Sequence, residues 1–129
     1  MPKNYLKNQN TNQKRQMSKT ITSEIKFLVE LDENRVPEKL TWSAEDGGVE
    51  LEDAKAMMLS IWDSKVQETL RIDLWTKDMP VDEMKRFFYE TLMTMGDSFL
   101  KATGETNIVE DLRDYCAHFA EKMELKAQG

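Results

Sequence analysis

Two eight-residue stretches of alternating polarity constrain the fold of this chain most strongly. AMMLSIWD covers residues 56–63 and ETLRIDLW covers residues 68–75. If Asp63 pairs with Glu68, one antiparallel register collects six apolar side chains on one face: Met57, Leu59, Ile61, Leu70, Ile72 and Leu74. Because burial of one face is what normally fixes strand register, this agreement predicts a β-hairpin that turns at residues 64–67.

The residues before this hairpin predict further strands. ITSEIKFLVELD, residues 21–32, and EKLTWSAED, residues 38–46, both alternate apolar and polar side chains with a period of two. Turn-forming residues that end at Pro37 separate them, and a Gly-Gly pair follows the second stretch. VELEDAK, residues 49–55, is compatible with either a helical turn or the lead-in to a strand.

The C-terminal half predicts two helices. The first begins near Pro80, with Asp82 and Glu83 in its first turn, and ends at Gly104. The second is predicted to begin at Asn107 in a capping-box arrangement with the residue three positions on. Apolar residues at steps of three and four predict one buried stripe on each helix: Val81, Met84, Phe87, Phe88, Leu92, Met95 and Phe99 on the first, and Ile108, Leu112, Tyr115, Cys116, Phe119 and Met123 on the second.

Four strands followed by two helices predict the α+β class. The expected architecture is a four-stranded antiparallel sheet with both helices packed on one face, a two-layer sandwich. Residues 19–127 are assigned to a single domain. Residues 1–18 are rich in Asn, Gln and Lys and are expected to be a disordered basic leader, either an extended start or a cloning remnant.

Charge and composition exclude several classes of function. The net charge is −6, and residues 1–20 hold five Lys or Arg and no acid, so the rest carries 13 − 24 = −11. An acidic body repels phosphate backbones, so nucleic acid is not an expected partner. The single cysteine fits a reducing compartment, and no apolar run matches a membrane span or a secretory signal. We therefore expect a cytoplasmic protein.

No residue pattern predicts catalysis or a cofactor. Glu110, Asp114, His118 and Glu121 share one helix face and could approach a divalent metal, but one histidine among acids is better explained by an exposed acidic face. Cys116 lies in an apolar stripe, where cysteine behaves as a small hydrophobic residue. We expect no enzyme activity, no metal and no cofactor.

One surface stands out from the strand alternation. Large apolar residues are predicted on the sheet face turned away from the helices, where polar residues are expected, and such patches often mark interfaces. Coverage by loops or by residues 46–54 is the alternative explanation. The candidate interaction surface consists of Leu28, Met58, Trp62 and Trp75.

Three stretches resemble the GldC family of gliding motility proteins of the Bacteroidetes. They are SEIKFLVELDENRVPEKLTWSAEDGG at 23–48, IWDSKVQETLRIDLWTKDMPVDEMKRFFYETL at 61–92 and ATGETNIVEDLRDYCAHFAEK at 102–122. The resemblance covers about residues 19–125, and LRIDLWTKDMPVDEMKRFF, residues 70–88, is its most distinctive string. It implies a small soluble accessory of the machinery that moves surface adhesins, with no known catalytic residues to carry over.

Three functional hypotheses follow. The first is a non-enzymatic accessory or adaptor that contacts other proteins of the gliding machinery through the candidate surface. The second is a chaperone-like homo-oligomer that presents the same apolar face to client segments. The third is a metal- or ligand-binding domain, centred on Glu110, Asp114 and His118 or on a pocket near residues 75–79.

Overall fold

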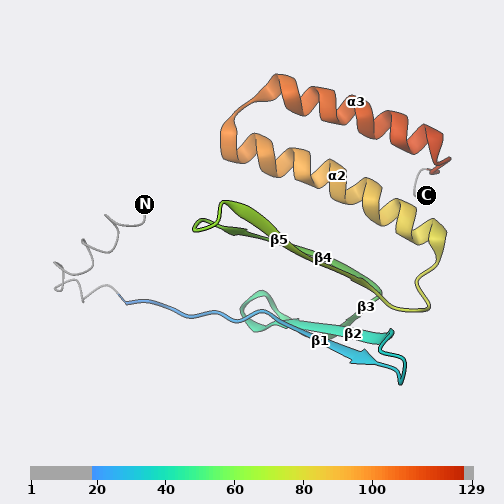
Figure 1. The fold of residues 1–129 in the computed structure, drawn as a ribbon. Helices are drawn as coiled ribbons and strands as arrows, with labels where there is room; N and C mark the ends of the chain where they lie inside the picture. Colours follow the sequence, from blue (N-terminus) through green and yellow to red (C-terminus); the bar gives the residue numbers. More distant parts are fainter. Residues whose placement is uncertain (1–18, 127–129) are drawn as a thin grey trace. The chain divides into compact units, whose positions relative to one another are not determined.

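The computed structural model describes residues 19–126, so the predicted leader at residues 1–18 lies outside the described part. Within it, five strands precede two long helices, and a short 3-10 turn at Glu45–Gly47 joins the second strand to the third (Figure 1). The strands are β1 (Lys26–Leu31), β2 (Pro37–Ala44), β3 (Val49–Ala54), β4 (Ala56–Asp63) and β5 (Glu68–Trp75), and the helices are α2 (Val81–Thr103) and α3 (Thr106–Lys122).

The strands form two antiparallel sheets, which corrects the prediction of one four-stranded sheet. One sheet has the order β1-β2-β3 and the other contains β4 and β5. The ambiguous residues 49–55 supply the third strand of the first sheet, and Lys55 alone separates that strand from β4. The chain therefore passes from one sheet into the next within a single residue, a step that alternation of polarity does not reveal.

By its contacts the chain divides into two compact units. Of the described residues, 19–28 and 41–53 belong to the first unit, and 29–40 with 54–126 belong to the second. In the first unit, the rings of Phe27 and Trp42 stack 6.5 Å apart. Also in that unit, the hydroxyl oxygen of Ser43 accepts a hydrogen bond from the backbone N–H of Leu51, which has a positive φ of 48°.

The β4–β5 hairpin, which we call the arm, has the predicted register. Asp63 faces Glu68, Ile61 faces Leu70 and Met57 faces Leu74. The carboxylate of Asp63 accepts a hydrogen bond from the Lys65 N–H at 2.9 Å, and its carbonyl accepts one from the N–H of Gln67 at 2.8 Å. These bonds close a four-residue turn, so the hairpin is confirmed in its bounds and in its pairing.

The helix ends are predicted in part. Pro80 precedes α2, and Gly104, with a φ of 74°, ends it in the left-handed conformation that glycine adopts without strain. The predicted capping box at Asn107 is wrong, because α3 already begins at Thr106 and Glu105 has no side-chain cap bond. Instead the hydroxyl oxygen of Thr103 accepts the N–H of Glu105, so the short connection between the helices supplies its own hydrogen bond.

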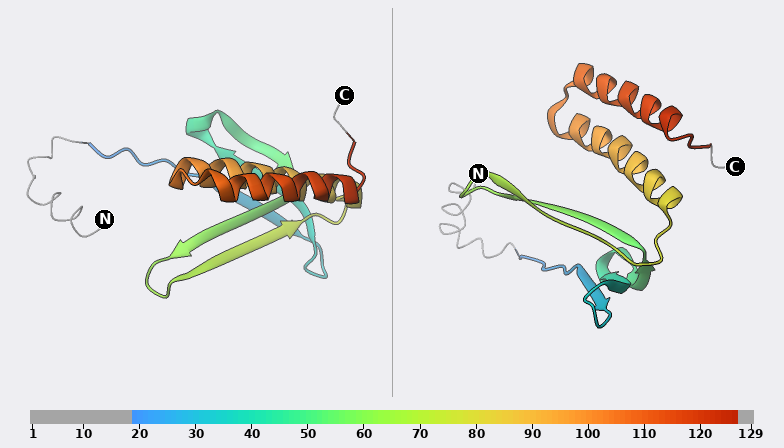
Figure 2. Two further views of the ribbon diagram at one scale, coloured as in Figure 1. Left: turned by 90° about the horizontal axis from the view of Figure 1, so that it is seen from above. Right: turned by 45° about the vertical axis from the view of Figure 1, so that its right-hand side comes forward.

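The two helices pack on each other in antiparallel orientation (Figures 1 and 2). Neither makes an extensive contact with the arm, so the predicted two-layer sandwich is wrong although the α+β class is confirmed. Gly96 is buried where the helices meet, and a Cβ there would lie 3.2 Å from Cδ2 of Leu112 and 3.7 Å from Cγ1 of Val109. The absence of a side chain therefore permits the close approach.

Burial follows this contact and only part of the predicted stripes. Val109 and Cys116 are fully buried on α3. In contrast, large apolar residues of the predicted stripes are exposed, because they lie beside the contact line and not on it: Val81, Phe88, Met95, Phe99, Ile108 and Tyr115.

We expect Gly96→Leu to lower the free energy of unfolding by roughly 1–3 kcal/mol, because a larger side chain must force the two helices apart. Urea unfolding followed by circular dichroism measures the change. Thr94→Leu places the same side chain at an exposed position of the same helix and should change stability much less. Equal effects of the two substitutions would contradict the close approach at Gly96.

Candidate interaction surfaces

The segment after β5, residues Thr76–Pro80, is held by several hydrogen bonds, and we call it the joint. Thr76 is only 2% exposed, and its N–H donates to the carbonyl of Lys55 at 2.8 Å. The N–H of Lys77 donates to the carbonyl of Pro37 at 3.0 Å. The joint is therefore bonded both to the residue before β4 and to the start of β2.

Side chains add a second set of bonds to the joint. The hydroxyl of Thr76 donates to the carboxylate of Asp78 at 2.6 Å, and this bond lowers the pKa of Asp78. The ammonium group of Lys77 lies 2.9 Å from the carboxylate of Asp32 and 3.5 Å from that of Glu38. The joint is thus bound to the turn between β1 and β2 by charge, and to β2 by a backbone bond.

Asp32 is the most perturbed acid of this group. Its carboxylate accepts hydrogen bonds from Lys77 and from the N–H groups of Val36 and Asn34. The Lys77 bond, followed by the backbone bonds, lowers the pKa of Asp32 to about 2, and the same contact raises the pKa of Lys77. Because every one of these charges has a protein partner, the charged joint is a structural connection.

The structure does not bring the four residues of the candidate surface onto one sheet. Leu28 lies on β1, whereas Met58, Trp62 and Trp75 lie on the arm. On the arm, polar residues separate the apolar residues of this patch. Between the two tryptophans, Arg71 donates hydrogen bonds to Ser60 and Asp73, each at 2.9 Å. The role of these residues in binding stays a prediction.

Trp62 and Trp75 occupy different surroundings. Trp62 is 59% exposed near the turn of the arm. Trp75, at the other end, lines an open groove of about 340 Å³ together with Met79 in the joint and apolar residues of both helices: Val81, Met84, Phe88 and Phe119, with Lys85. Trp75 therefore lies beside the helices and not on a face turned away from them. The pocket that the third hypothesis placed near residues 75–79 corresponds to this groove.

The other face of the arm is apolar, and its half nearest the turn is exposed. We call Met57, Leu59, Ile61, Leu70, Ile72 and Leu74 the apolar arm face. Its residues nearest the turn, Ile61, Leu70 and Ile72, are about half exposed, at 52%, 51% and 49%. Sequence reasoning found these six residues but assigned them to the core under the helices. The signal was present in the alternation, and only the expected covering layer was wrong.

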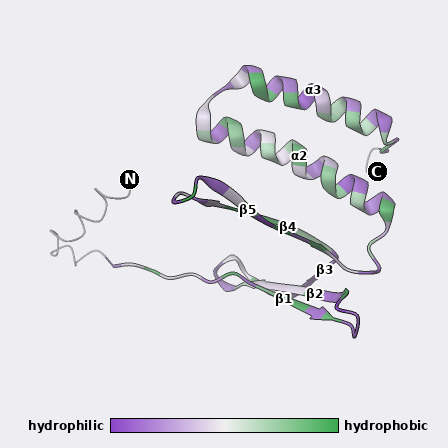
Figure 3. Cartoon of the chain, in the orientation of Figure 1, coloured by the Kyte–Doolittle hydropathy of each residue, from purple (hydrophilic) through white to green (hydrophobic). Residues whose placement is uncertain are grey.

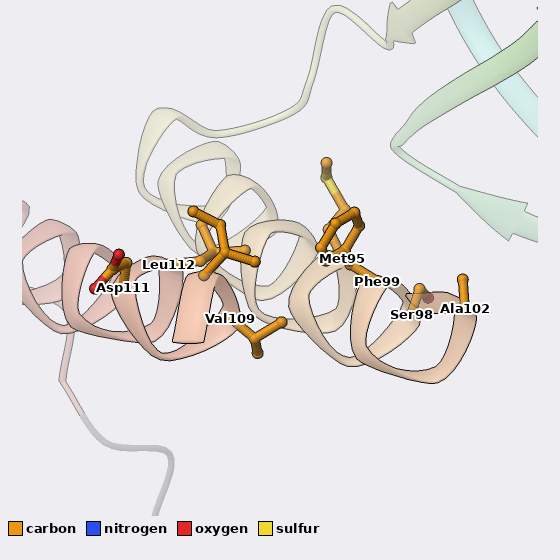
Figure 4. Close-up of a pocket in the computed structure, with 8 residues that line it drawn as sticks. Met95, Ser98, Phe99, Ala102, Val109, Asp111 and Leu112 are labelled. Atoms are coloured by element: carbon orange, nitrogen blue, oxygen red, sulfur yellow. The ribbon is translucent and has the colours of Figure 1, made fainter. Parts of the chain in front are cut away.

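A second apolar hollow, of about 740 Å³, lies at the end of the helix pair near Gly104. Figure 4 shows Met95 and Phe99 of α2 and Leu112 of α3 projecting to the same side of the helix pair. Ser98 and Ala102, two small residues of α2, also line the hollow. Hydropathy along both helices alternates between apolar and polar segments, as a helix with one apolar side requires (Figure 3).

The residues considered as metal ligands or nucleophiles do not form a common site in the described part. Within residues 19–126, no group of three or more His, Cys, Asp or Glu side chains could hold a metal ion. His118 packs beside Tyr115, with ring centroids 6.0 Å apart. Burial raises the pKa of the Cys116 thiol, which keeps it in the unreactive protonated form. None of the helices in the described part is long and apolar enough to cross a membrane.

Comparison with known proteins identifies a family. The family model described as "Gliding motility-associated protein GldC-like" matches residues 37–125, which include the arm, the joint and both helices. No curated protein and no solved structure gives a significant match. The resemblance read from the sequence is confirmed over this range.

The Asp32 contact predicts a specific pH dependence. The pKa of Asp32 is about 2 in the folded chain, below the ordinary value of about 3.9, so its ionised form stabilises the fold above about pH 4. This contribution is lost as the pH falls from about 4 through 2. Asp32→Asn removes the titration, so its unfolding free energy should fall less steeply than that of the wild type in this window.

Urea unfolding curves between about pH 2 and 6 measure the difference. Glu33→Gln, in the same turn, controls for loss of one negative charge. Parallel curves for the wild type and Asp32→Asn would contradict a stabilising contact at Asp32.

Proposed function

We propose that the chain, which belongs to the GldC-like family of gliding motility-associated proteins, is a cytoplasmic, non-enzymatic accessory protein that holds a partner protein of the gliding machinery. The family supplies the association with motility. The single cysteine supports the compartment. The well-paired charges of the joint and the buried Cys116 support a binding role over a catalytic one.

The apolar arm face carries the proposal. A two-stranded hairpin is marginally stable by itself in water, and it usually needs a third strand or a packed layer. In the described residues β4 and β5 pair only with each other, and they form no extensive contact with the helices. The half-exposed residues near the turn are therefore left for another polypeptide to cover.

The open edges of the arm suggest how a partner binds. Each of its two strands has eight residues and one edge without a neighbouring strand in the described part. An extended segment of a partner can pair with such an edge through backbone hydrogen bonds. Its alternate side chains then lie beside those of the apolar arm face and pack against them, so backbone pairing supplies affinity and the apolar contacts supply specificity.

Two cross-strand pairs allow a test of which face binds. Ile61 faces Leu70 on the apolar arm face, and Trp62 faces Thr69 on the opposite face. We expect Ile61→Ser with Leu70→Ser to abolish recovery of the partner in affinity purification from the source organism and to impair surface spreading. Lys65→Ser, in the turn of the arm, should leave both unchanged.

The tryptophan face has its own variant. Trp62→Ser should reduce recovery only if the face predicted from the sequence also contacts the partner. Circular dichroism must show that each variant remains folded. If both the Ile61/Leu70 and the Trp62 variants recover the same proteins as the wild type, the arm is not the binding surface.

A chaperone-like homo-oligomer is the second candidate function. It is favoured by the number of large apolar side chains exposed on both the arm and the helix pair. Such a protein binds many unfolded clients, whereas an adaptor binds one partner.

We expect an adaptor to leave the aggregation of a thermally unfolded model client unchanged when the two are mixed in equal amounts. Light scattering at fixed temperature measures aggregation, with serum albumin as the inert control. Suppression that Ile61→Ser with Leu70→Ser removes would favour the chaperone-like function over the adaptor.

A further inference from the structure

The pair of helices presents one broad apolar side, which meets the arm only at its Phe88 end, in the Trp75 groove. Three residues of α2 and three of α3 form it, and we call them the helical apolar face: Phe88, Met95, Phe99, Ile108, Leu112 and Tyr115. Met95, Ile108 and Tyr115 are each more than half exposed, and Phe99 is 44% exposed. The steps of seven and four on α2, and of four and three on α3, keep these residues on one side of each helix.

Apart from Leu112, whose side chain also lies against Gly96, these residues are surplus to the contact between the two helices. Val109 and Cys116 are buried, and Gly96 allows the close approach, so the pair is already packed without them. Another side of the pair is polar, where Arg113 of α3 donates to Asp97 of α2 at 3.0 Å. The helix pair as a whole is thus amphipathic, like half of a four-helix bundle.

We propose that the helical apolar face packs against the same face of a second copy of this chain, and that the homodimer so formed contains an antiparallel four-helix bundle. A twofold contact needs a face that complements itself. An acidic chain with a net charge of −6 can meet its own copy only where like charges do not oppose each other. The six residues of the helical apolar face carry no charge, so they meet this condition.

The dimensions are those of a small specific interface. The 17 residues of α3 give an overlap with α2 of about 26 Å, and two helices side by side span about 18 Å. The footprint is then about 470 Å² on each copy, or roughly 1,000 Å² in total when the ridged surface is counted, which reaches the lower bound for specific interfaces. A contact limited to the hollow near Gly104 would be much smaller.

Two charges without an ion pair in the described residues, one at each end of the helix pair, favour one orientation. Lys85 lies in the second turn of α2, at the end of the pair that holds the Trp75 groove, and Asp111 lies in the second turn of α3, at the opposite end. Neither forms an ion pair within residues 19–126. Antiparallel packing of two copies places the Lys85 end of each against the Asp111 end of the other. Parallel packing would instead set like charges together.

This dimer is separate from the proposed binding of a partner through the arm. The variants that test it are on the helices, so either proposal can fail while the other stands.

The mass of the purified chain is the first test. Light scattering coupled to size exclusion should give twice the chain mass of 15.1 kDa, and the melting temperature should rise with protein concentration, as it does when folding and association are linked. A monomer at micromolar concentration overturns the proposal. A tetramer or larger assembly whose mass does not change on disruption of the helical apolar face overturns it as well.

Substitutions on the helices locate the contact. Phe99→Glu and, separately, Ile108→Glu should each weaken dimerisation roughly a hundredfold or more, because each places a buried, uncompensated charge in the interface twice. Thr94→Glu introduces the same charge at an exposed position of α2 outside the face and should leave the mass unchanged. A folded dimer in both of the first two variants would overturn the assignment of this face.

A charge exchange tests the orientation without disturbing the apolar contact. Asp111→Lys and Lys85→Asp should each weaken the dimer roughly tenfold at low salt, since each creates two like-charge contacts. The double variant should restore the wild-type affinity. If the double variant is as weak as the two single changes combined, the antiparallel arrangement is wrong.

Discussion

The backbone bonds of Thr76 and Lys77 are the constraint on which the second unit depends. They bind the end of β5 to the residue before β4 and to the first residue of β2, at Lys55 and Pro37. Since unpaired backbone groups are costly to bury, a nearly inaccessible residue such as Thr76 can occupy this position only with its N–H bonded. These bonds fix the point from which α2 departs.

A consequence of that departure is that apolar faces remain without a covering layer. In the described part the fully buried hydrophobic residues are Leu40, Val109 and Cys116. Stability of a domain rests on a small surplus of burial over lost conformational entropy. The half-exposed residues of the apolar arm face and of the helical apolar face still leave apolar surface accessible to solvent. Association with another polypeptide would bury this surface and so add to stability.

The sequence predicted the secondary structure and the register of the arm well, and the arrangement of the strands into sheets poorly. The register of the arm was predictable because six side chains agree on one pairing, and the end of α2 was predictable because Gly104 suits the left-handed conformation. The division into two sheets was not predictable, since the change from β3 to β4 occurs at Lys55 without a glycine, a proline or a break in composition.

The prediction of the contacts between the helices was incomplete for a related reason. Periodicity located the apolar residues of both helices, but a 3.6-residue repeat does not say which part of a wide stripe meets the neighbour. Gly96, which lacks a side chain, decided it, because helices approach most closely where the least volume lies between them. Glycine has a low helix propensity, so in a sequence Gly96 indicates a less stable part of the helix and gives no sign of a role in packing.

Charge explains why the candidate surface takes its present form. The patch predicted from alternation is divided by Arg71 and its bonds to Ser60 and Asp73, which satisfy polar groups in the middle of that face. The apolar arm face and the helical apolar face have no such interruption. In an acidic chain the surfaces that can be desolvated at least cost are those without charge, because burial of an unpaired carboxylate is expensive. The two uncharged faces are therefore where association, with a partner or with a second copy, meets the smallest electrostatic opposition.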